Sequence, residues 1–532
     1  MKRIIVIITA ALLAVSCNKQ DKIQLAQLQD DLVELQQSAD GIQVPSAIDA
    51  VPDEDEDYSF VFDKEIYGVD AAGSVTVGYT LPEDSQIEVI VGDGWSASVN
   101  QNGATGTVTI SAPDPAKYCD VLLTATSASG RQTASKLPLL IRDPYSDATR
   151  PVMEAMGYYS FKPWNANLEN YQKLADAGIT MVTVETDEED YLQQMALARA
   201  VGIKVLAVIG WATEGWYESM SPESLARLEQ LIESMKNRPE LFGYHIWDEP
   251  SVNHIFELMA IEDKMTQLDP DHPVYVNLRP NGSSEGMGAS TYAEYVEVFA
   301  SMMHLKQLSF DMYPALANGW VQTDWHYCLE IVSDAARRYN KPFWAFAATC
   351  WIDLEQVLID RAKPTVENVQ LQVYTDLAYG AQAIQYFTIQ DYGGTDFAPI
   401  MRDGTWTEAY DILKTVNLRM QKRAYIFKDS KVAKVRQSGE WAPFEASLAY
   451  NDLPPEINSL NVSHSGTISF IENNGNEYVA VVNNYPCFDQ ILSIDFNTPV
   501  YLIGSEGQFE LLEPGMTHYA LKSGEMLVFK YR

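Results

Sequence analysis

Cysteine is scarce in this sequence, with five in 532 residues. Four of them, Cys119, Cys328, Cys350 and Cys487, lie far apart and form no CxxC pair. Their spacing argues against a disulfide framework or a zinc site and predicts buried free thiols. Histidines and carboxylates are not grouped at ligand spacing either, so we predict no catalytic metal and no cofactor.

Basic side chains are also few: 37 Lys and Arg stand against 73 Asp and Glu, for a formal net charge of −36. This balance argues against nucleic acid as a partner. Beyond the N-terminus the sequence has no uninterrupted apolar run of about 18 residues, the length that predicts a spanning helix. No glycine-rich phosphate fingerprint follows any expected strand, which argues against a dinucleotide-binding open sheet.

The N-terminus has the pattern of a targeting segment. A positive "MKR" precedes the apolar "IIVIITAALLAV", and small residues lead to Cys17 in "AVSC". Residues 1–17 resemble a bacterial lipoprotein signal, which implies a lipidated Cys17. We expect a protein anchored to a cell-envelope membrane by lipid alone. A simple secretory signal with a chance cysteine is the alternative.

The periodicity of the remaining sequence predicts a chain of several domains. Residues 18–57 combine a short amphipathic helix with an acidic, proline-containing linker, which is typical of a tether. Residues 58–143 alternate with period two in short runs such as "SVTVGYTL" and predict an immunoglobulin-like β-sandwich. Residues 144–428 contain eight strand–helix pairs and predict a (β/α)8 TIM barrel. Residues 429–532 return to period two and predict a second β-sandwich.

The fourth expected barrel strand, "LFGYHIWDEP", ends in two carboxylates, Asp248 and Glu249. Polar residues at the C-terminal ends of barrel strands face the catalytic mouth, so we expect both there. By the same argument, five further strand-end residues are candidates for the site. They are Glu185, Asn277, Asp311, Tyr313 and Asp391.

Tryptophans follow several of these strands, and Trp164, Trp211 and Trp351 are closest to strand ends. Flat rings stack on the C–H faces of sugars, so these residues favour a cleft for an oligosaccharide or polysaccharide. Packing of loops onto the barrel is the alternative. We expect a monomer.

A barrel whose fourth strand ends in Glu, flanked by Asp and Pro, resembles the clan-A glycoside hydrolases. The resemblance implies that Glu249 is the general acid/base. The segments "NKPFWAF" and "PIMRDGTWTEAYDILKTVN" are similar to glycosidases related to the family-42 β-galactosidases. One departure stands out: clan A places its nucleophile, a second Glu, after strand seven, where this sequence has Ala347, Ala348 and Thr349.

Three explanations of this departure remain open. Another carboxylate, such as Glu185, Asp311 or Asp391, could complete the pair that glycoside hydrolysis needs. The adjacent Asp and Glu also resemble family-20 and family-123 hexosaminidases, which implies that Asp248 orients an N-acetyl group while Glu249 acts as the acid. Two adjacent carboxylates raise one pKa, which suits an acid. The third explanation is a barrel that binds a glycan without cleaving it.

Overall fold

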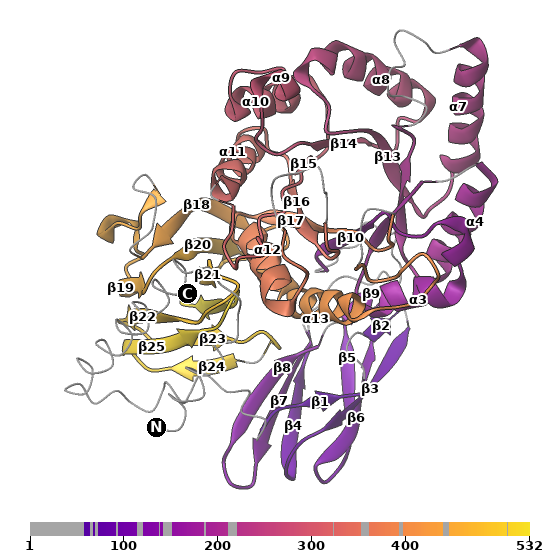
Figure 1. The fold of residues 1–532 in the computed structure, drawn as a ribbon. Coiled ribbons are helices and arrows are strands. Elements are labelled where there is room, and N and C mark those ends of the chain that lie inside the picture. Colours follow the sequence, from indigo (N-terminus) through magenta and orange to yellow (C-terminus); the bar gives the residue numbers. More distant parts are fainter. Residues whose placement is uncertain are drawn as a thin grey trace.

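The computed structural model describes residues 58–532 except 64–66, 70–72, 92–93, 114–120, 138, 142–151, 186–187, 211–220, 323, 353–360, 393–396, 440–445 and 508. A closed parallel barrel lies between two modules built of antiparallel sheets (Figure 1). The predicted fold class, a multidomain TIM barrel with flanking β domains, is therefore confirmed. The expected signal segment and tether lie outside the described residues.

Eight strands form the barrel, each hydrogen-bonded in parallel to the next, and the last pairs with the first. They are β10 (Glu154–Tyr158), β11 (Met181–Val184), β12 (Lys204–Val208), β13 (Leu241–Asp248), β14 (Val274–Leu278), β15 (Leu308–Phe310), β16 (Phe343–Ala348) and β17 (Ala381–Phe387). Most of their residues are buried, as expected for strands covered on both faces. All eight predicted strands are present, so β16 is the seventh strand of the barrel.

Helices follow each strand and cover the outside of the barrel. They are α3 (Leu168–Asp176), α4 (Glu188–Ala200), α7 (Pro222–Met235), α8 (Ile255–Leu268), α9 (Ser284–Met287), α10 (Tyr292–Met302), α11 (Trp325–Arg338), α12 (Val366–Ala378), α13 (Glu408–Lys422) and α14 (Ala424–Phe427), with short 3-10 turns η2 (Pro163–Asn165) and η3 (Val252–His254). A third 3-10 turn, η5 (Tyr450–Asp452), belongs to the C-terminal module. Local sequence sets their limits. The Asn167 side chain caps the first turn of α3, and Gly178, just beyond its end, has a φ of +74°.

The two flanking modules are both β-sandwiches. Strands of the first are β1 (Val61–Phe62), β2 (Tyr67–Val69), β3 (Ser74–Thr80), β4 (Ser85–Ile90), β5 (Ser96–Asn102), β6 (Thr105–Ser111), β7 (Leu122–Ser127), β8 (Gln132–Lys136) and β9 (Leu139–Ile141). Strands of the second are β18 (Lys431–Ser438), β19 (Ile457–Val462), β20 (Gly466–Asn473), β21 (Asn476–Asn483), β22 (Gln490–Phe496), β23 (Val500–Ile503), β24 (Phe509–Leu512), β25 (Gly515–Leu521) and β26 (Met526–Lys530). In each module, side chains from two sheets share one core, such as Val77 and Leu123 in the first.

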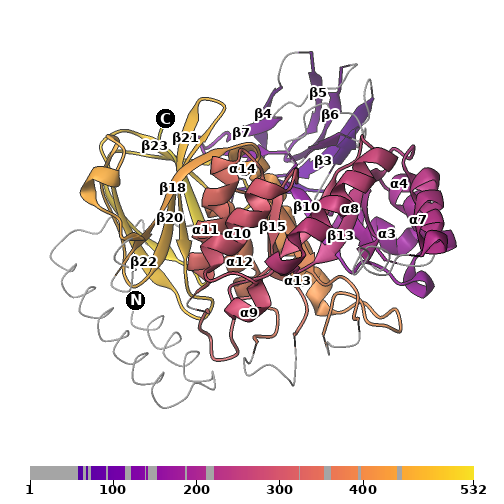
Figure 2. The ribbon, with the colours of Figure 1, turned by 90° about the horizontal axis from the view of Figure 1, so that it is seen from above.

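The C-terminal sandwich lies beside α11 and α12 in both views (Figures 1 and 2). Its contact with the barrel is polar as well as apolar. The fully buried Arg423 donates from Nη1 to the carbonyl oxygen of Met526 (3.1 Å), and Arg419 donates from Nε to Glu506 (2.9 Å). Buried hydrogen bonds of this kind fix the orientation of the module against the barrel.

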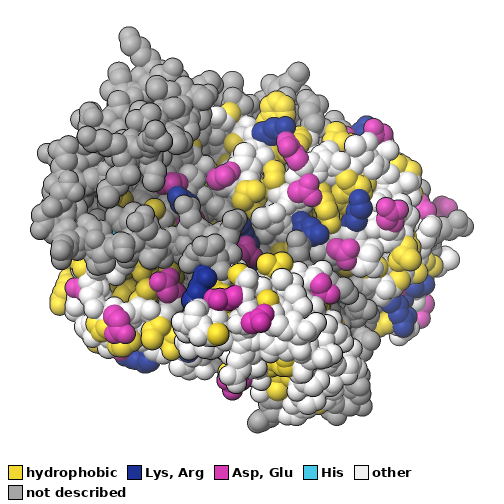
Figure 3. Space-filling model, turned by 90° about the horizontal axis from the view of Figure 1, so that it is seen from below, with side chains coloured by type: hydrophobic (Ala, Val, Ile, Leu, Met, Phe, Trp, Pro, Cys, Tyr) yellow, Lys and Arg dark blue, Asp and Glu magenta, His cyan; other side chains and the backbone are white. Residues whose placement is uncertain are grey.

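On the face shown in Figure 3, acidic and basic side chains are interspersed, so the net negative charge is not gathered into one patch there. Within the described ranges, no helix combines the length and the apolar character that crossing a membrane requires. Cys328 and Cys350 are buried free thiols, and Cys487 is half-buried.

Candidate active site

The end of strand β13 sets the position of the two adjacent carboxylates. Asp248 pairs in register with Asn277 of β14, and the Glu249 amide donates to the Asn277 carbonyl oxygen (2.9 Å). Glu249 has a φ of +48°, in the left-handed region that non-glycine residues rarely adopt. Such backbone conformations gather at functional sites. Both side chains reach solvent at the mouth of the barrel.

Asp311, directly after β15, lies beside these two residues, close enough for its carboxyl and that of Glu249 to act on each other's pKa. Burial raises the pKa of Asp311 well above its usual range, and the negative charges of Glu249 and Asp248 add to the effect. The pKa of Glu249 is raised by partial burial and then by the charge of Asp248. Asp311, the more deeply buried of the two, therefore keeps its proton to a higher pH than a free aspartic acid does.

A chain of buried hydrogen bonds fixes Asp248. Asn277 Nδ2 donates to Asp248 Oδ1 (3.2 Å), and Ser309 Oγ donates to Asn277 Oδ1 (3.0 Å). Gln385 Nε2 donates to Ser309 Oγ (2.7 Å), while the Tyr275 hydroxyl donates to Gln385 Oε1 (2.6 Å). Because Asn277 Oδ1 is occupied by Ser309, its amide nitrogen must face Asp248. Burial raises the pKa of Asp248, and this hydrogen bond opposes the rise.

Arg279 and Tyr295 hold the turn that carries Glu249. The Tyr295 hydroxyl, from α10, donates to the carbonyl oxygen of Pro250 (2.9 Å) and accepts from the Arg279 amide (3.1 Å). The Arg279 guanidinium packs against Gly286, where a Cβ would lie 2.6 Å from Nη1. Its positive charge counteracts the rise in the pKa of Glu249.

Strand β16 ends without a carboxylate among residues 343–352, all of which the structure describes. Thr349 occupies the end of the strand, fully buried, with its Oγ1 donating to the carbonyl oxygen of Thr388 (3.1 Å). Nearby, the Tyr313 ring packs against Phe387 and Phe346, with ring centroids 5.1 and 6.4 Å apart. The departure noted in the sequence is therefore a property of the seventh strand and does not arise from miscounting.

Glu185 and His245 are the next titratable residues near Asp248. Glu185, after β11, is 3.4 Å from the ammonium of Lys162, and its negative charge acts on both Asp248 and His245. His245 is buried in β13 against the rings of Tyr158 and Tyr275. Burial lowers the pKa of His245 to about 4, so the imidazole is neutral at pH 7.

The remaining predicted residues surround the mouth of the barrel. Asp391, after β17, is buried and lies 3.6 Å from Nε of Arg402. Trp164 is 65% exposed, and its indole donates to the Arg402 carbonyl oxygen (3.0 Å). The half-buried Trp351 donates from Nε1 to the Arg361 carbonyl oxygen (3.2 Å). Trp211 and Cys17 lie outside the described residues.

Sequence reasoning had no signal for Tyr295 or Gly286, which reach the site from α10 and α9. Tyr275 and Ser309 did carry a signal: each stands two residues before a predicted site residue, Asn277 or Asp311, and alternate residues of a strand share a face. Gln385, on β17, became recognisable only through its bonds to these two.

No protein-family model matches the chain, and no curated protein is detectably similar to it in sequence. Among solved structures, it is similar to a family-5 glycoside hydrolase from Bacteroides vulgatus (12% identity, 72% of this chain and 90% of that one, TM-score 0.49). It is also similar to a catalytic mutant of a family-42 β-galactosidase from G. stearothermophilus (10%, 72% and 99%, TM-score 0.46). A β-galactosidase from Marinomonas ef1 matches at 11% identity over 51% of this chain, with a TM-score of 0.38, and the match spans 60% of that enzyme's length. At these identities the likeness is one of fold.

Proposed function

We propose that this protein is a glycoside hydrolase in which Glu249 is the general acid/base. The observation that carries the proposal is the acid cluster, defined as Asp248, Glu249 and Asp311, at the mouth of the barrel. Glu249 reaches solvent, has a raised pKa and lies beside Asp311, a second carboxyl whose pKa burial raises well above its usual range. A carboxylic acid of this kind can protonate the oxygen of a leaving sugar.

In this proposal, Asp311 stays protonated beside Glu249 and does not attack the anomeric carbon of the substrate. Glycosidases that retain configuration place their two carboxyl groups about 5–5.5 Å apart, and inverting enzymes about 6.5–9.5 Å apart. A sugar ring has to fit between the two groups. Asp311 and Glu249 each act on the pKa of the other, which indicates that they lie side by side and not on opposite faces of a substrate.

The second group in the reaction is then assigned to the substrate. An N-acetylated sugar can attack its own anomeric carbon with the acetamido oxygen while Glu249 gives its proton to the departing oxygen. Water then opens the cyclic intermediate, and the Glu249 carboxylate takes the proton of that water. Asp248 is adjacent and held by Asn277, which suits a group that orients the acetamido N–H. The absence of a carboxylate on β16 favours this route over a protein nucleophile.

A screen of aryl glycosides, including N-acetylhexosaminides, tests the activity, and Glu249→Gln tests the residue. We expect this variant to lose about 100- to 10,000-fold in kcat/KM, since it keeps the shape of the side chain but has no proton to give. Glycan affinity, measured by calorimetry, should be retained. Glu233→Gln is the matched control, because Glu233 lies on α7 with 68% of its side chain exposed. Equal turnover by the two variants would overturn the assignment.

A non-catalytic glycan-binding protein is the second candidate, and the bare end of β16 is the observation that favours it. In that case the wild type would bind oligosaccharides, and its melting temperature would rise with them, but no glycoside in the screen would be cleaved. For either function we propose attachment to the cell envelope through a lipid on Cys17, which the pattern of residues 1–17 supports.

A further inference from the structure

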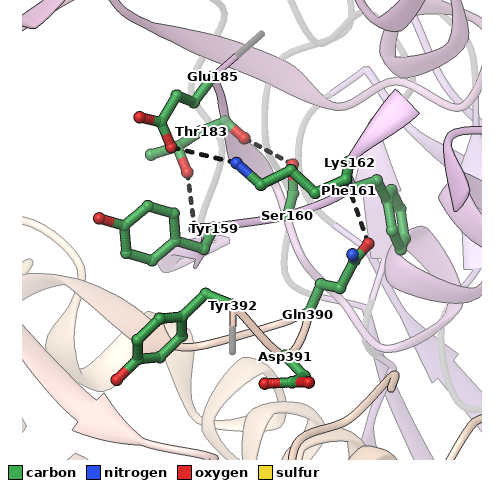
Figure 4. Close-up of a pocket in the computed structure, with 9 residues that line it drawn as sticks. All are labelled: Tyr159, Ser160, Phe161, Lys162, Thr183, Glu185, Gln390, Asp391 and Tyr392. Atoms are coloured by element: carbon green, nitrogen blue, oxygen red, sulfur yellow. Dashed lines mark hydrogen bonds and ion pairs between the residues drawn. The ribbon is translucent and has the colours of Figure 1, made fainter. Parts of the chain in front are cut away.

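A concave region lies on the opposite side of the barrel mouth from the acid cluster. It is an open depression between the ends of β10 and β11 and the segment after β17. We call it the β10/β17-side depression, after the first and eighth strands of the barrel. In Figure 4, Lys162 and Glu185 line one side, Gln390 and Asp391 the other, and Tyr159 and Tyr392 form an aromatic wall.

Gln390 gives the depression an unused hydrogen-bond donor. This residue is only 2% exposed, and its Oε1 accepts from the Lys162 amide (3.1 Å) and from Asn165 Nδ2 (3.3 Å). Two donors at Oε1 fix the orientation of the amide. Its Nε2 has no hydrogen-bond partner among the described residues, and Figure 4 shows that the amide borders the depression. A buried donor of this kind calls for an acceptor, which a bound ligand can supply.

The other groups in the wall suit a sugar. The Lys162 ammonium and the Glu185 carboxylate, 3.4 Å apart, are both partly exposed and so can donate and accept at the rim. The rings of Tyr159 and Tyr392 stack with centroids 5.6 Å apart, which presents an apolar surface beside these polar groups. A pyranose has apolar C–H faces and hydroxyl groups that both donate and accept, and it matches this combination.

The charges in the wall indicate a neutral sugar. Two carboxylates, Glu185 and Asp391, line the depression, and each faces a cation, Lys162 at 3.4 Å and Arg402 at 3.6 Å, so the wall has no surplus charge to attract an ionic unit such as a uronic acid. The depression and the acid cluster lie at the same end of the barrel, where the C-terminal ends of its strands meet, so a glycan that spans the mouth can contact both.

We propose that the β10/β17-side depression is a subsite for a neutral monosaccharide unit, separate from the position at which the bond is cleaved. The inference rests on the proposed function for its role, but the binding itself does not require hydrolysis. It assigns Gln390 and Lys162 as residues that bind the glycan, and it moves Glu185 from catalysis to substrate contact.

Calorimetry on the Glu249→Gln protein tests the subsite without turnover. The probes are galactotriose, mannotriose, chitotriose and trigalacturonate, each measured alone. Gln390→Glu keeps an oxygen for the Lys162 amide and Asn165 but replaces the unused donor by an acceptor. We expect it to raise the Kd of the neutral trisaccharide that binds by at least 10-fold. Gln132→Glu, on an exposed position of β8, is the control and should leave the Kd unchanged.

Lys162→Met is a second variant, which leaves the buried side-chain amide of Gln390 unchanged. Its control is Lys431→Met, because 79% of the Lys431 side chain is exposed. Lys162→Met should weaken the same trisaccharide. The subsite is overturned if no neutral trisaccharide binds, if both Gln390→Glu and Lys162→Met bind as well as their controls, or if trigalacturonate binds more tightly than every neutral probe. Loss of binding in these variants of a protein that cleaves no glycoside would support the subsite and reject the hydrolase.

Discussion

The acid cluster and the β10/β17-side depression differ in how their carboxylates are paired. In the acid cluster, Asp248, Glu249 and Asp311 lie against one another, and the positive charge that acts on Glu249 is Arg279. In the depression each carboxylate has a cation of its own, since Glu185 lies 3.4 Å from Lys162 and Asp391 lies 3.6 Å from Arg402.

This difference in pairing suits the two regions of the barrel mouth to different roles, proton transfer in one and substrate recognition in the other. Carboxyl groups that crowd one another hold protons more tightly and become acids. Carboxylates that are paired with cations are fixed in orientation and accept hydrogen bonds. The same residue type therefore serves proton transfer on one side of the mouth and recognition on the other.

Asp248→Asn should give the largest effect among the variants that compare the two regions. The amide cannot orient an acetamido N–H as a carboxylate does, so we expect kcat to fall about 100-fold with little change in KM. Glu185→Gln is the counterpart in the depression and should raise KM about 10-fold while kcat stays within about twofold. Steady-state kinetics on an oligosaccharide separates the two. Equal losses of kcat in both variants would show that the regions do not divide the work as proposed.

Much of this arrangement could be predicted because the C-terminal ends of parallel strands meet at one end of a barrel. That rule alone places Asp248, Glu249 and Asp311 near one another, although more than 60 residues separate the first from the last. The alternation of strands and helices also fixed the strand count, and with it the absence of a carboxylate on the seventh strand.

Other features could not be predicted from the sequence, because they depend on contacts that form only when the barrel closes. The chain from Tyr275 to Asp248 depends on the register in which Asn277 stands opposite Ser309, and periodicity carries no information on register between strands. The unused donor of Gln390 depends on the amide of Lys162, which is 228 residues away in the sequence. Such contacts are set by tertiary packing and leave no local pattern.

His245 lies between the two regions: the charge of Glu185 acts on its imidazole, and its ring packs against Tyr275. Its titration should make the free energy of unfolding depend on pH. Its pKa is about 4 in the folded protein and about 6.5 in an unfolded chain, so the unfolded state binds more protons between these values. Stability is therefore lost as the pH falls. We expect a loss of about 2 kcal/mol from pH 7 to pH 5 from this residue.

Urea denaturation of the wild type and of His245→Phe at pH 7 and pH 5 measures this contribution. The phenylalanine cannot be protonated, so the variant should lose less stability on acidification by about the same 2 kcal/mol. Burial also lowers the pKa of His326. Because His326 is present in both proteins, its contribution to the pH dependence of stability cancels when the two are compared. An identical loss in both proteins would contradict the prediction.

Arg279→Gln should produce the smallest effect, a shift in the pH profile. The positive charge lowers the pKa of Glu249, so its removal raises that pKa and keeps the acid protonated to higher pH. We expect the alkaline limb of kcat/KM to move up by about half a unit, because water at the open mouth screens the charge. Asp248→Asn removes a negative charge and should move the limb down. Tyr295→Phe cuts the hydrogen bonds to Pro250 and Arg279 without changing any charge, so it should lower the melting temperature and leave the limb in place. Shifts of the same sign in Arg279→Gln and Asp248→Asn would mean that the alkaline limb reports a group other than Glu249.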